Sequence, residues 1–283
     1  MKSFCIKTNH IDTIDYLLNE LENIKLEHVY YRPSQFKLYQ NVIIHYTGEN
    51  TDKFYNILAS LLSKSILTFY EQPIMNSILN LNYFYFSEYE KKQILENAEE
   101  LLESGSNESF VRKENLFLST LAYIMEHKSI LLDGFVNFRI QEYITILDDT
   151  IDLAVNKFLI EREYSEFIHL LKLYINSKEC ETGVTHLIYS NGESILLDDK
   201  KNIISITDNI FNAKYLSDIT FSSNDYALNT LLTILPEQIN IHLLDPKDEF
   251  INTLELIFDD RIKFCTDCNL CRTYQLITNK VKN

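Results

Sequence analysis

Three cysteines near the C-terminus form the group whose residue types and spacing point most directly to chemistry. Cys265, Cys268 and Cys271 follow one another at C-x-x-C-x-x-C spacing in the run FCTDCNLC. A tight turn brings side chains three residues apart to one point, so the three thiols can converge. Thiolates are ligands of Zn²⁺ and of the iron in iron–sulfur clusters. The spacing therefore indicates a candidate site for zinc or an iron–sulfur cluster.

This candidate site is one ligand short, because both zinc and iron–sulfur iron usually take four protein ligands. The fourth would come from Cys5, Cys180, a histidine, a protein partner or a second copy of the chain. The bacterial ferredoxin run adds a fourth cysteine and a proline, whereas Arg272 and Thr273 follow Cys271 here. Two other interpretations stay open. The thiols are either inert in a reducing cell or a redox pair, although the thioredoxin-like order of strand, CxxC and helix is absent.

Two further groups could carry chemistry, and a structural interpretation is favoured for both. Asp148, Asp149 and Asp152 read D-D-x-x-D on a predicted helix, where carboxylates could hold Mg²⁺ against a diphosphate as in helical isoprenoid synthases. No second acidic motif accompanies them, so we interpret the run as a solvated helix face. His186 and His242 fall in predicted strands, and we interpret them as structural residues.

Sequence motifs of the common enzyme classes are missing from the chain. It contains no G-x-x-x-x-G-K-[ST] loop, no G-x-G-x-x-G fingerprint, no G-x-S-x-G elbow and no H-E-x-x-H pair. Its five glycines are scattered, which argues against a phosphate-cradling loop. We therefore predict a non-enzymatic protein with no catalytic residues.

The composition narrows the partners and the compartment. The 26 Lys and Arg against 41 Asp and Glu give a net charge of −15 and disfavour nucleic-acid binding. No run approaches the roughly 18 apolar residues of a membrane span, and the N-terminus lacks a secretory apolar stretch. Five cysteines, an odd number, do not resemble a secreted disulfide framework. These features predict a cytoplasmic protein with a protein partner or self-association.

The positions that must hold the cysteines belong to a predicted α+β fold of three parts. Residues 1–72 predict a small βαββα module, with strands near 4–6, 28–32 and 42–46. Residues 73–180 predict a central helical bundle, since every signal from 73 to 177 is helical. Within it, Ser87 and Glu90 have capping-box spacing, and the pair Asp133-Gly134 breaks the chain. Two long helices follow, with a hinge at 161–163.

Residues 181–283 predict a C-terminal α/β module that ends in the cysteine turn. The pair Asn191-Gly192 suits the positive φ angles of a tight hairpin. A helix over 224–235 is stopped by Pro236. A strand at 239–243, a helix at 248–258 and a strand at 261–265 then predict a parallel pair joined by a right-handed crossover.

The pattern as a whole resembles that of a known family. Its central part consists of Asp133-Gly134-Phe135-Val136-Asn137-Phe138-Arg139, Tyr143, Asp152, Ala154-Val155, Phe158-Leu159, Glu163-Tyr164, Glu166-Phe167-Ile168 and Leu170-Leu171. Its C-terminal part consists of Pro236, Ile241-His242, Phe264-Cys265, Cys268 and Leu270-Cys271. These residues are similar to the signature of the YtxC-like family, and the resemblance is weak before Pro73.

The resemblance implies a role in sporulation, since the family is grouped with sporulation proteins of endospore-forming bacteria. It implies no activity, cofactor or catalytic residue. The chain departs from the family pattern at Asp267, where the family tends to have glycine, which would stiffen the turn between Cys265 and Cys268. Together these observations predict a non-enzymatic cytoplasmic sporulation protein that acts through protein contacts. The alternative is a zinc or iron–sulfur protein with a redox or sensing role.

Overall fold

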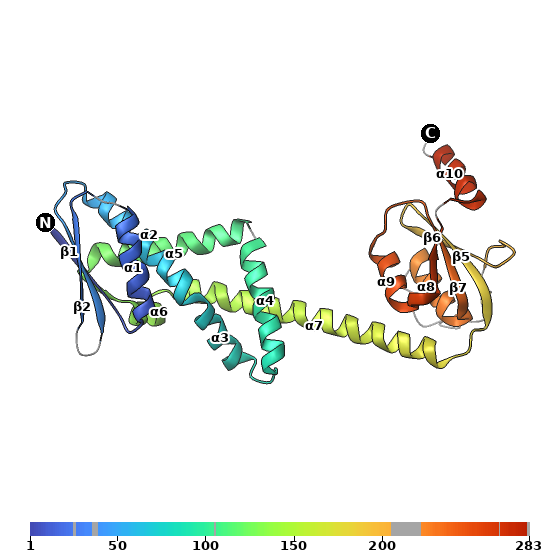
Figure 1. The fold of residues 1–283 in the computed structure, drawn as a ribbon, viewed down its shortest axis with the longest axis horizontal. Helices are drawn as coiled ribbons and strands as arrows, with labels where there is room; N and C mark the ends of the chain where they lie inside the picture. The colour runs from blue at the N-terminus through green and yellow to red at the C-terminus, as the bar shows by residue number, and fades with distance from the viewer. Residues whose placement is uncertain (25–26, 36–38, 105, 205–221, 266, 282–283) are drawn as a thin grey trace. The chain divides into compact units, whose positions relative to one another are not determined.

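The structure is a computed structural model that describes residues 1–24, 27–35, 39–104, 106–204, 222–265 and 267–281. The fold is mixed α+β, as the sequence predicts, with a helical bundle and two small sheets. The chain divides into two compact units, Met1–Glu161 and Arg162–Asn283. Figure 1 draws the helices and strands of both and labels most of them.

The sheet of the first unit has the strand order β2-β3-β1-β4. Its strands are β1 (Lys2–Thr8), β2 (Val29–Gln35), β3 (Gln40–Tyr46) and β4 (Ser129–Leu131). The three strands predicted before residue 72 are confirmed. β4 corrects the prediction that residues 73–177 are helical throughout, because it pairs in parallel with β1. Ile130 is fully buried there beside Ile6, so burial of a β-branched side chain favours the extended form.

Six helices within the described residues join this sheet in the first unit, and α7 follows them. They are α1 (Ile11–Ile24), α2 (Thr51–Phe69), α3 (Glu71–Asn82), α4 (Glu88–Ser104), α5 (Ser106–Glu126) and α6 (Leu132–Arg139). The predicted capping box at the start of α4 is confirmed: Ser87 N donates to Glu90 Oε2 (2.8 Å) and Glu90 N to Ser87 Oγ (3.3 Å). Gly134 lies inside α6, so the predicted break at that residue is wrong. The helix ends instead at Arg139, before Ile140.

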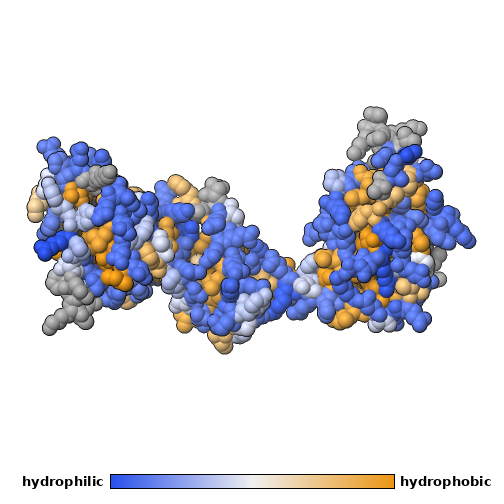
Figure 2. Space-filling model, in the orientation of Figure 1, coloured by the Kyte–Doolittle hydropathy of each residue, from blue (hydrophilic) through white to orange (hydrophobic). Residues whose placement is uncertain are grey.

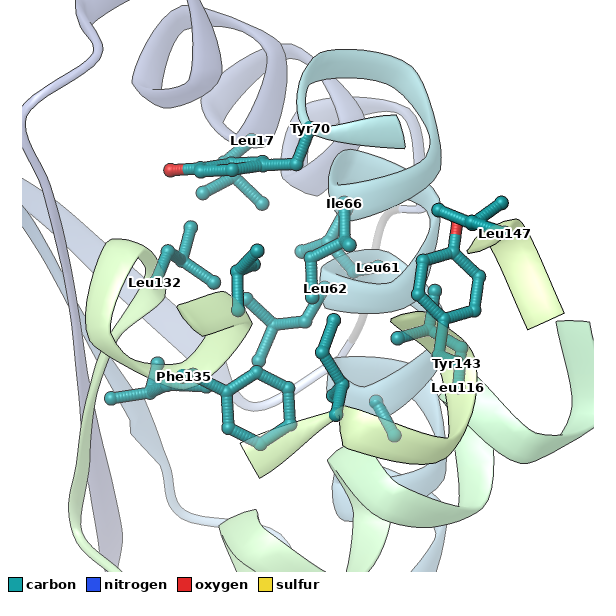
Figure 3. Packing of buried hydrophobic residues seen from close by; sticks show 14 of the residues in the cluster. Leu17, Leu61, Leu62, Ile66, Tyr70, Leu116, Leu132, Phe135, Tyr143 and Leu147 are labelled. Atoms are coloured by element: carbon teal, nitrogen blue, oxygen red, sulfur yellow. The ribbon is translucent and has the colours of Figure 1, made fainter. Parts of the chain in front are cut away.

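One hydrophobic core joins the sheet to the helices of the first unit. Figure 3 shows Leu61, Leu62 and Ile66 of α2 at its centre. Leu132 and Phe135 of α6 lie on one side of them, and Leu116, Tyr143 and Leu147 lie on the other. The helical bundle therefore packs around α2, and the buried residues extend from Phe4 to Phe158.

Helix α7 runs without interruption from Gln141 to Ser177. The predicted hinge at 161–163 is wrong, because glutamate and arginine are good helix formers and neither proline nor glycine interrupts the turn. The charged residues mark a change of packing partner instead. Ile151 and Phe158 belong to the core of the first unit, whereas Ile168 and Ile175 belong to that of the second.

The second unit contains a four-stranded sheet in the order β6-β5-β7-β8, with three helices after α7 in the residues described. Its elements are β5 (Thr182–Ser190), β6 (Glu193–Leu197), α8 (Ser223–Ile234), β7 (Pro236–Leu243), α9 (Glu249–Phe258), β8 (Ile262–Phe264) and α10 (Asn269–Val281). The predicted hairpin is confirmed, with Asn191 at φ 54° and Gly192 at φ 76°. The predicted parallel strand pair is also confirmed, since β7 pairs in parallel with β8.

The two faces of this second sheet differ. Leu187 and Tyr189 of β5 and Ile239 and Ile241 of β7 belong to a hydrophobic core that includes residues of α8 and α9. Because side chains alternate along a strand, His186 and His242 lie on the opposite face. That is the face on which the cysteine segment closes.

The surface visible in Figure 2 is mostly hydrophilic in both units, as the acidic composition suggests. Across the part of the chain that the structure describes, no helix combines the length and apolarity needed to cross a membrane.

Candidate metal centre

The pairing of two neighbouring strands brings the first cysteine to a histidine. Ile241 of β7 is in register with Phe264 of β8. The ladder continues one residue further, since the N–H of Cys265 donates to the carbonyl oxygen of Ile241 (2.9 Å). Cys265 is therefore level with His242, and the alternation of side chains puts both on the same face.

The start of α10 supplies the other two thiols. The first backbone bond of this helix runs from the N–H of Arg272 to the carbonyl oxygen of Cys268 (3.1 Å), so Cys268 stands at the helix entrance. Cys271 lies three residues later, about one turn on, and its side chain returns to the same point. The Sγ atoms of Cys268 and Cys271 are 3.7 Å apart, and Cys271 Sγ is 3.9 Å from Cys265 Sγ.

His242 completes a group of four. Its Nδ1 lies 3.4 Å from Cys268 Sγ and 3.4 Å from Cys271 Sγ. All four ligand atoms lie within 4.8 Å of one another, close enough to hold a metal ion. Sulfurs bound about 2.3 Å from a tetrahedral zinc lie about 3.8 Å from each other, and a nitrogen ligand lies about 3.6 Å from each sulfur. The separations in this group approach those of such a tetrahedron.

Burial and hydrogen bonding give the three thiols different acidities. Burial would raise the pKa of Cys268, but the N–H groups of Cys271 and Leu270, together with the neighbouring thiols, lower it below its usual value. Burial and hydrogen bonds to the other two thiols raise the pKa of Cys271 to about 12. Burial also raises the pKa of Cys265. The backbone N–H groups at the start of α10 therefore favour the thiolate form of Cys268, whereas burial disfavours it at Cys265 and Cys271.

The histidine has the protonation state that a ligand needs. His242 is only 3% exposed, and burial lowers its pKa, with the charge of His186 as the next cause. At neutral pH the imidazole is therefore uncharged and one ring nitrogen offers a lone pair. A neutral histidine and three cysteines form the Cys₃His donor set found in structural zinc sites.

A model of the YtxC-like family matches residues 56–263, more than half of the chain. The chain belongs to the YtxC-like family. A protein of Bacillus subtilis (strain 168), named YtxC and described as uncharacterized, is 21% identical over 213 residues, which cover 72% of this chain and 74% of that protein. No solved structure shows a significant match.

The family match includes both histidines and stops two residues before Cys265. It thus covers the sheet that carries His186 and His242, whereas the three cysteines lie beyond it. The membership confirms the resemblance seen in the sequence and supplies no cofactor. The four converging side chains alone indicate a site.

Among the described residues, the other ligand candidates are not members of this group. Cys5 lies in β1 of the first unit, and Cys180 is an exposed residue between α7 and β5. Asp148 and Asp152 accept hydrogen bonds from the end of α3, from Asn82 Nδ2 (3.1 Å) and Tyr83 OH (2.6 Å). Within the described residues, these aspartates are not part of a converging set of metal-ligating side chains.

The strand position of His242 favours a structural role, but the structure places this residue among the thiols. Its strand alternates Ile239 and Ile241 toward the core with His242 away from it. That alternation, combined with the predicted parallel pairing of this strand with the one ending at Cys265, is the signal that could have identified it.

Proposed function

We propose that the second unit binds one zinc ion through Cys265, Cys268, Cys271 and His242 Nδ1. The observation that carries the proposal is the convergence of these four ligand atoms within 4.8 Å. Four protein ligands leave no open position for a substrate, which is the arrangement of a structural rather than a catalytic zinc site. The ion would tie the start of α10 to the ends of β7 and β8.

The same distances favour a single ion over an iron–sulfur cluster. Each cysteine of a [4Fe–4S] cluster binds a different iron atom, so the cluster must fit between its ligands. The two nearest-sulfur distances of 3.7 and 3.9 Å leave room for one ion at the centre. A donor set of three soft thiolates and one imidazole suits zinc.

Metal analysis of the full-length protein, purified without oxygen and without added metal, tests this proposal. We expect one equivalent of zinc, and less than half an equivalent of zinc after reconstitution would overturn it. One iron per chain without sulfide would instead indicate a mononuclear iron site, and iron with sulfide a cluster. Cys268→Ser should lose the metal, whereas Cys180→Ser, at an exposed cysteine outside the group, should retain it.

We further propose that the protein works in the cytoplasm of sporulating cells through a protein partner and catalyses no reaction. Its membership of the YtxC-like family supports this role. Its cysteines are free thiols, which persist in a reducing compartment such as the cytoplasm. An exposed apolar patch supports the protein contact. Four side chains around the connection of α3 to α4 are between 63% and 75% exposed: Leu81, Phe84, Tyr85 and Tyr89. Patches of this kind mark interaction sites.

Deletion of the gene in an endospore-forming host tests the cellular role, and unaltered sporulation would count against it. Complementation separates the patch from the fold. Phe84→Ser with Tyr89→Ser should fail to restore sporulation, while Leu118→Ser, at a residue 52% exposed on α5, should restore it. Equal rescue by both variants would remove the patch from the proposal.

A further inference from the structure

The ring nitrogen of His242 that faces away from the thiols has a partner of its own. His242 Nε2 lies 3.0 Å from Nδ1 of His186, and the two ring centroids are 5.2 Å apart. His186 comes from β5, the strand next to β7, and occupies the same face of the sheet. The contact therefore depends on the parallel pairing of these two strands.

The chemistry of imidazole fixes the direction of this hydrogen bond once Nδ1 of His242 binds a metal. A metal-binding nitrogen carries no proton, so a neutral His242 holds its proton on Nε2. That N–H must then donate to Nδ1 of His186, which accepts with its lone pair. His186 is consequently the hydrogen-bond acceptor that selects the tautomer of His242.

We propose that His186 is the positioning residue of the metal centre, a role that rests on the proposed zinc site. By accepting the proton of His242 Nε2–H, it holds the imidazole ring so that Nδ1 points at Cys268 and Cys271. Partners of this kind orient a ligating histidine and increase its basicity, and their removal commonly weakens metal binding about 10–100-fold.

The burial of His242 makes this partner difficult to replace. At 3% exposure, the ring has little access to bulk water, so Nε2–H would lose its acceptor if His186 became an apolar residue. The alternative tautomer, with the proton on Nδ1, would aim a hydrogen at two sulfurs 3.4 Å away and offer no lone pair there. Loss of His186 thus weakens the nitrogen ligand while leaving all three cysteines in place.

Zinc affinity, measured by competition with a chromophoric chelator, tests the inference in the full-length protein. His186→Ala should bind zinc about 10–100-fold more weakly than the unaltered protein. His186→Asn should restore affinity to within about fivefold, because the amide oxygen of asparagine can accept in place of Nδ1. Val184→Ala, a partly exposed position on the same strand and face, is the matched control and should leave affinity unchanged.

Cobalt substitution adds a readout that a purely structural role would not change. With Co²⁺, His186→Ala should shift the visible ligand-field bands toward those of His242→Ala, and His186→Asn should retain the bands of the unaltered protein. Unchanged zinc affinity in His186→Ala would overturn the inference, as would equal weakening in the Ala and Asn variants. If the unaltered protein itself takes up no metal, the zinc site is what fails.

Discussion

Each unit of this protein gathers polar groups at one point, and the two groups balance their charges in different ways. In the first unit, Arg112 Nη1 donates to Glu71 Oε2 (2.6 Å), and the hydroxyl of Tyr143 donates to the same oxygen. In the second unit, the sulfur atoms of three cysteines and a ring nitrogen of His242 lie within 4.8 Å of one another. The first group contains its own cation and anion. The second consists of metal-ligating atoms that a metal cation would bind.

This difference teaches how a buried polar group can be made compatible with a folded interior. A buried carboxylate is tolerated when a guanidinium and hydrogen bonds compensate for the lost water. Thiolates packed against one another repel, so the second group is stable as thiolates only around a cation and otherwise keeps its protons. The comparison therefore predicts that chelators affect one unit and charge removal affects the other.

Metal removal should have the largest effect. Structural zinc contributes apparent binding free energies of about 10–16 kcal/mol in zinc-finger peptides, comparable with the whole stability of a domain. We expect chelation, or Cys271→Ser, to abolish the hydrogen-exchange protection of α10 and β8 and to leave α2 and α5 of the first unit protected. Cys180→Ser is the matched control, since that cysteine is exposed. Equal protection of α10 with and without metal would break the comparison.

Removal of the cation from the first group should have the next largest effect. Arg112 is 4% exposed and the side chain of Glu71 is 16% exposed, so Arg112→Met leaves a largely buried carboxylate without its counterion. We expect a loss of about 3–5 kcal/mol in the free energy of unfolding of the first unit, measured with urea by circular dichroism. The neighbouring exposed residue provides the control, and Lys113→Met should change stability little. Zinc content should stay the same in both variants.

Tyr143→Phe should have a smaller effect that depends on pH. Burial, and then the charge of Glu71, raise the pKa of Tyr143 above its usual value. The loss of a hydrogen bond to a carboxylate should cost about 1.5–3 kcal/mol at pH 7. Because the folded pKa lies above that of the unfolded chain, the phenol contributes stability below pH of about 10 and loses it above.

The difference in unfolding free energy between the unaltered protein and Tyr143→Phe should therefore narrow as pH rises from 7 to 10.5. Urea titrations at both pH values measure it. A difference that widens with pH would show that Tyr143 ionises in the folded state and would contradict the assignment of its hydroxyl as the donor to Glu71.

The sequence predicted the parts of the fold that depend on neighbouring residues. Periodicity, the Ser87–Glu90 cap and the Asn191-Gly192 turn are local signals, and the elements they predicted are present. Strand β4 and the course of α7 escaped prediction for a different reason. Ile130 is extended because β1 lies beside it. The charged residues at 161–163 do not end α7, because the helix packs on a hydrophobic core both before and after them.

The candidate site divides along the same line. Three of its members lie within seven residues, and their spacing was enough to single them out. His242 and His186 join them through strand register, which a single sequence encodes only weakly. Arg112 and Tyr143 lie 41 and 72 positions after Glu71 along the chain, and the three residues share no motif. Only the packed structure brings them together.

The smallest effect should follow from Asp267→Gly, which removes the carboxylate next to Cys268. Asp267 forms an ion pair with Arg272, Oδ2 to Nη2 at 2.6 Å and Oδ1 to Nε at 3.1 Å. Both side chains are more than half exposed, at 56% and 67%, so solvent screens the pair. We expect zinc affinity to change by less than about fivefold, as measured by chelator competition, because none of the four ligand atoms belongs to Asp267. A loss of zinc affinity as large as that of Cys271→Ser would mean that the turn, rather than the four converging ligands, determines whether the second group binds a metal cation.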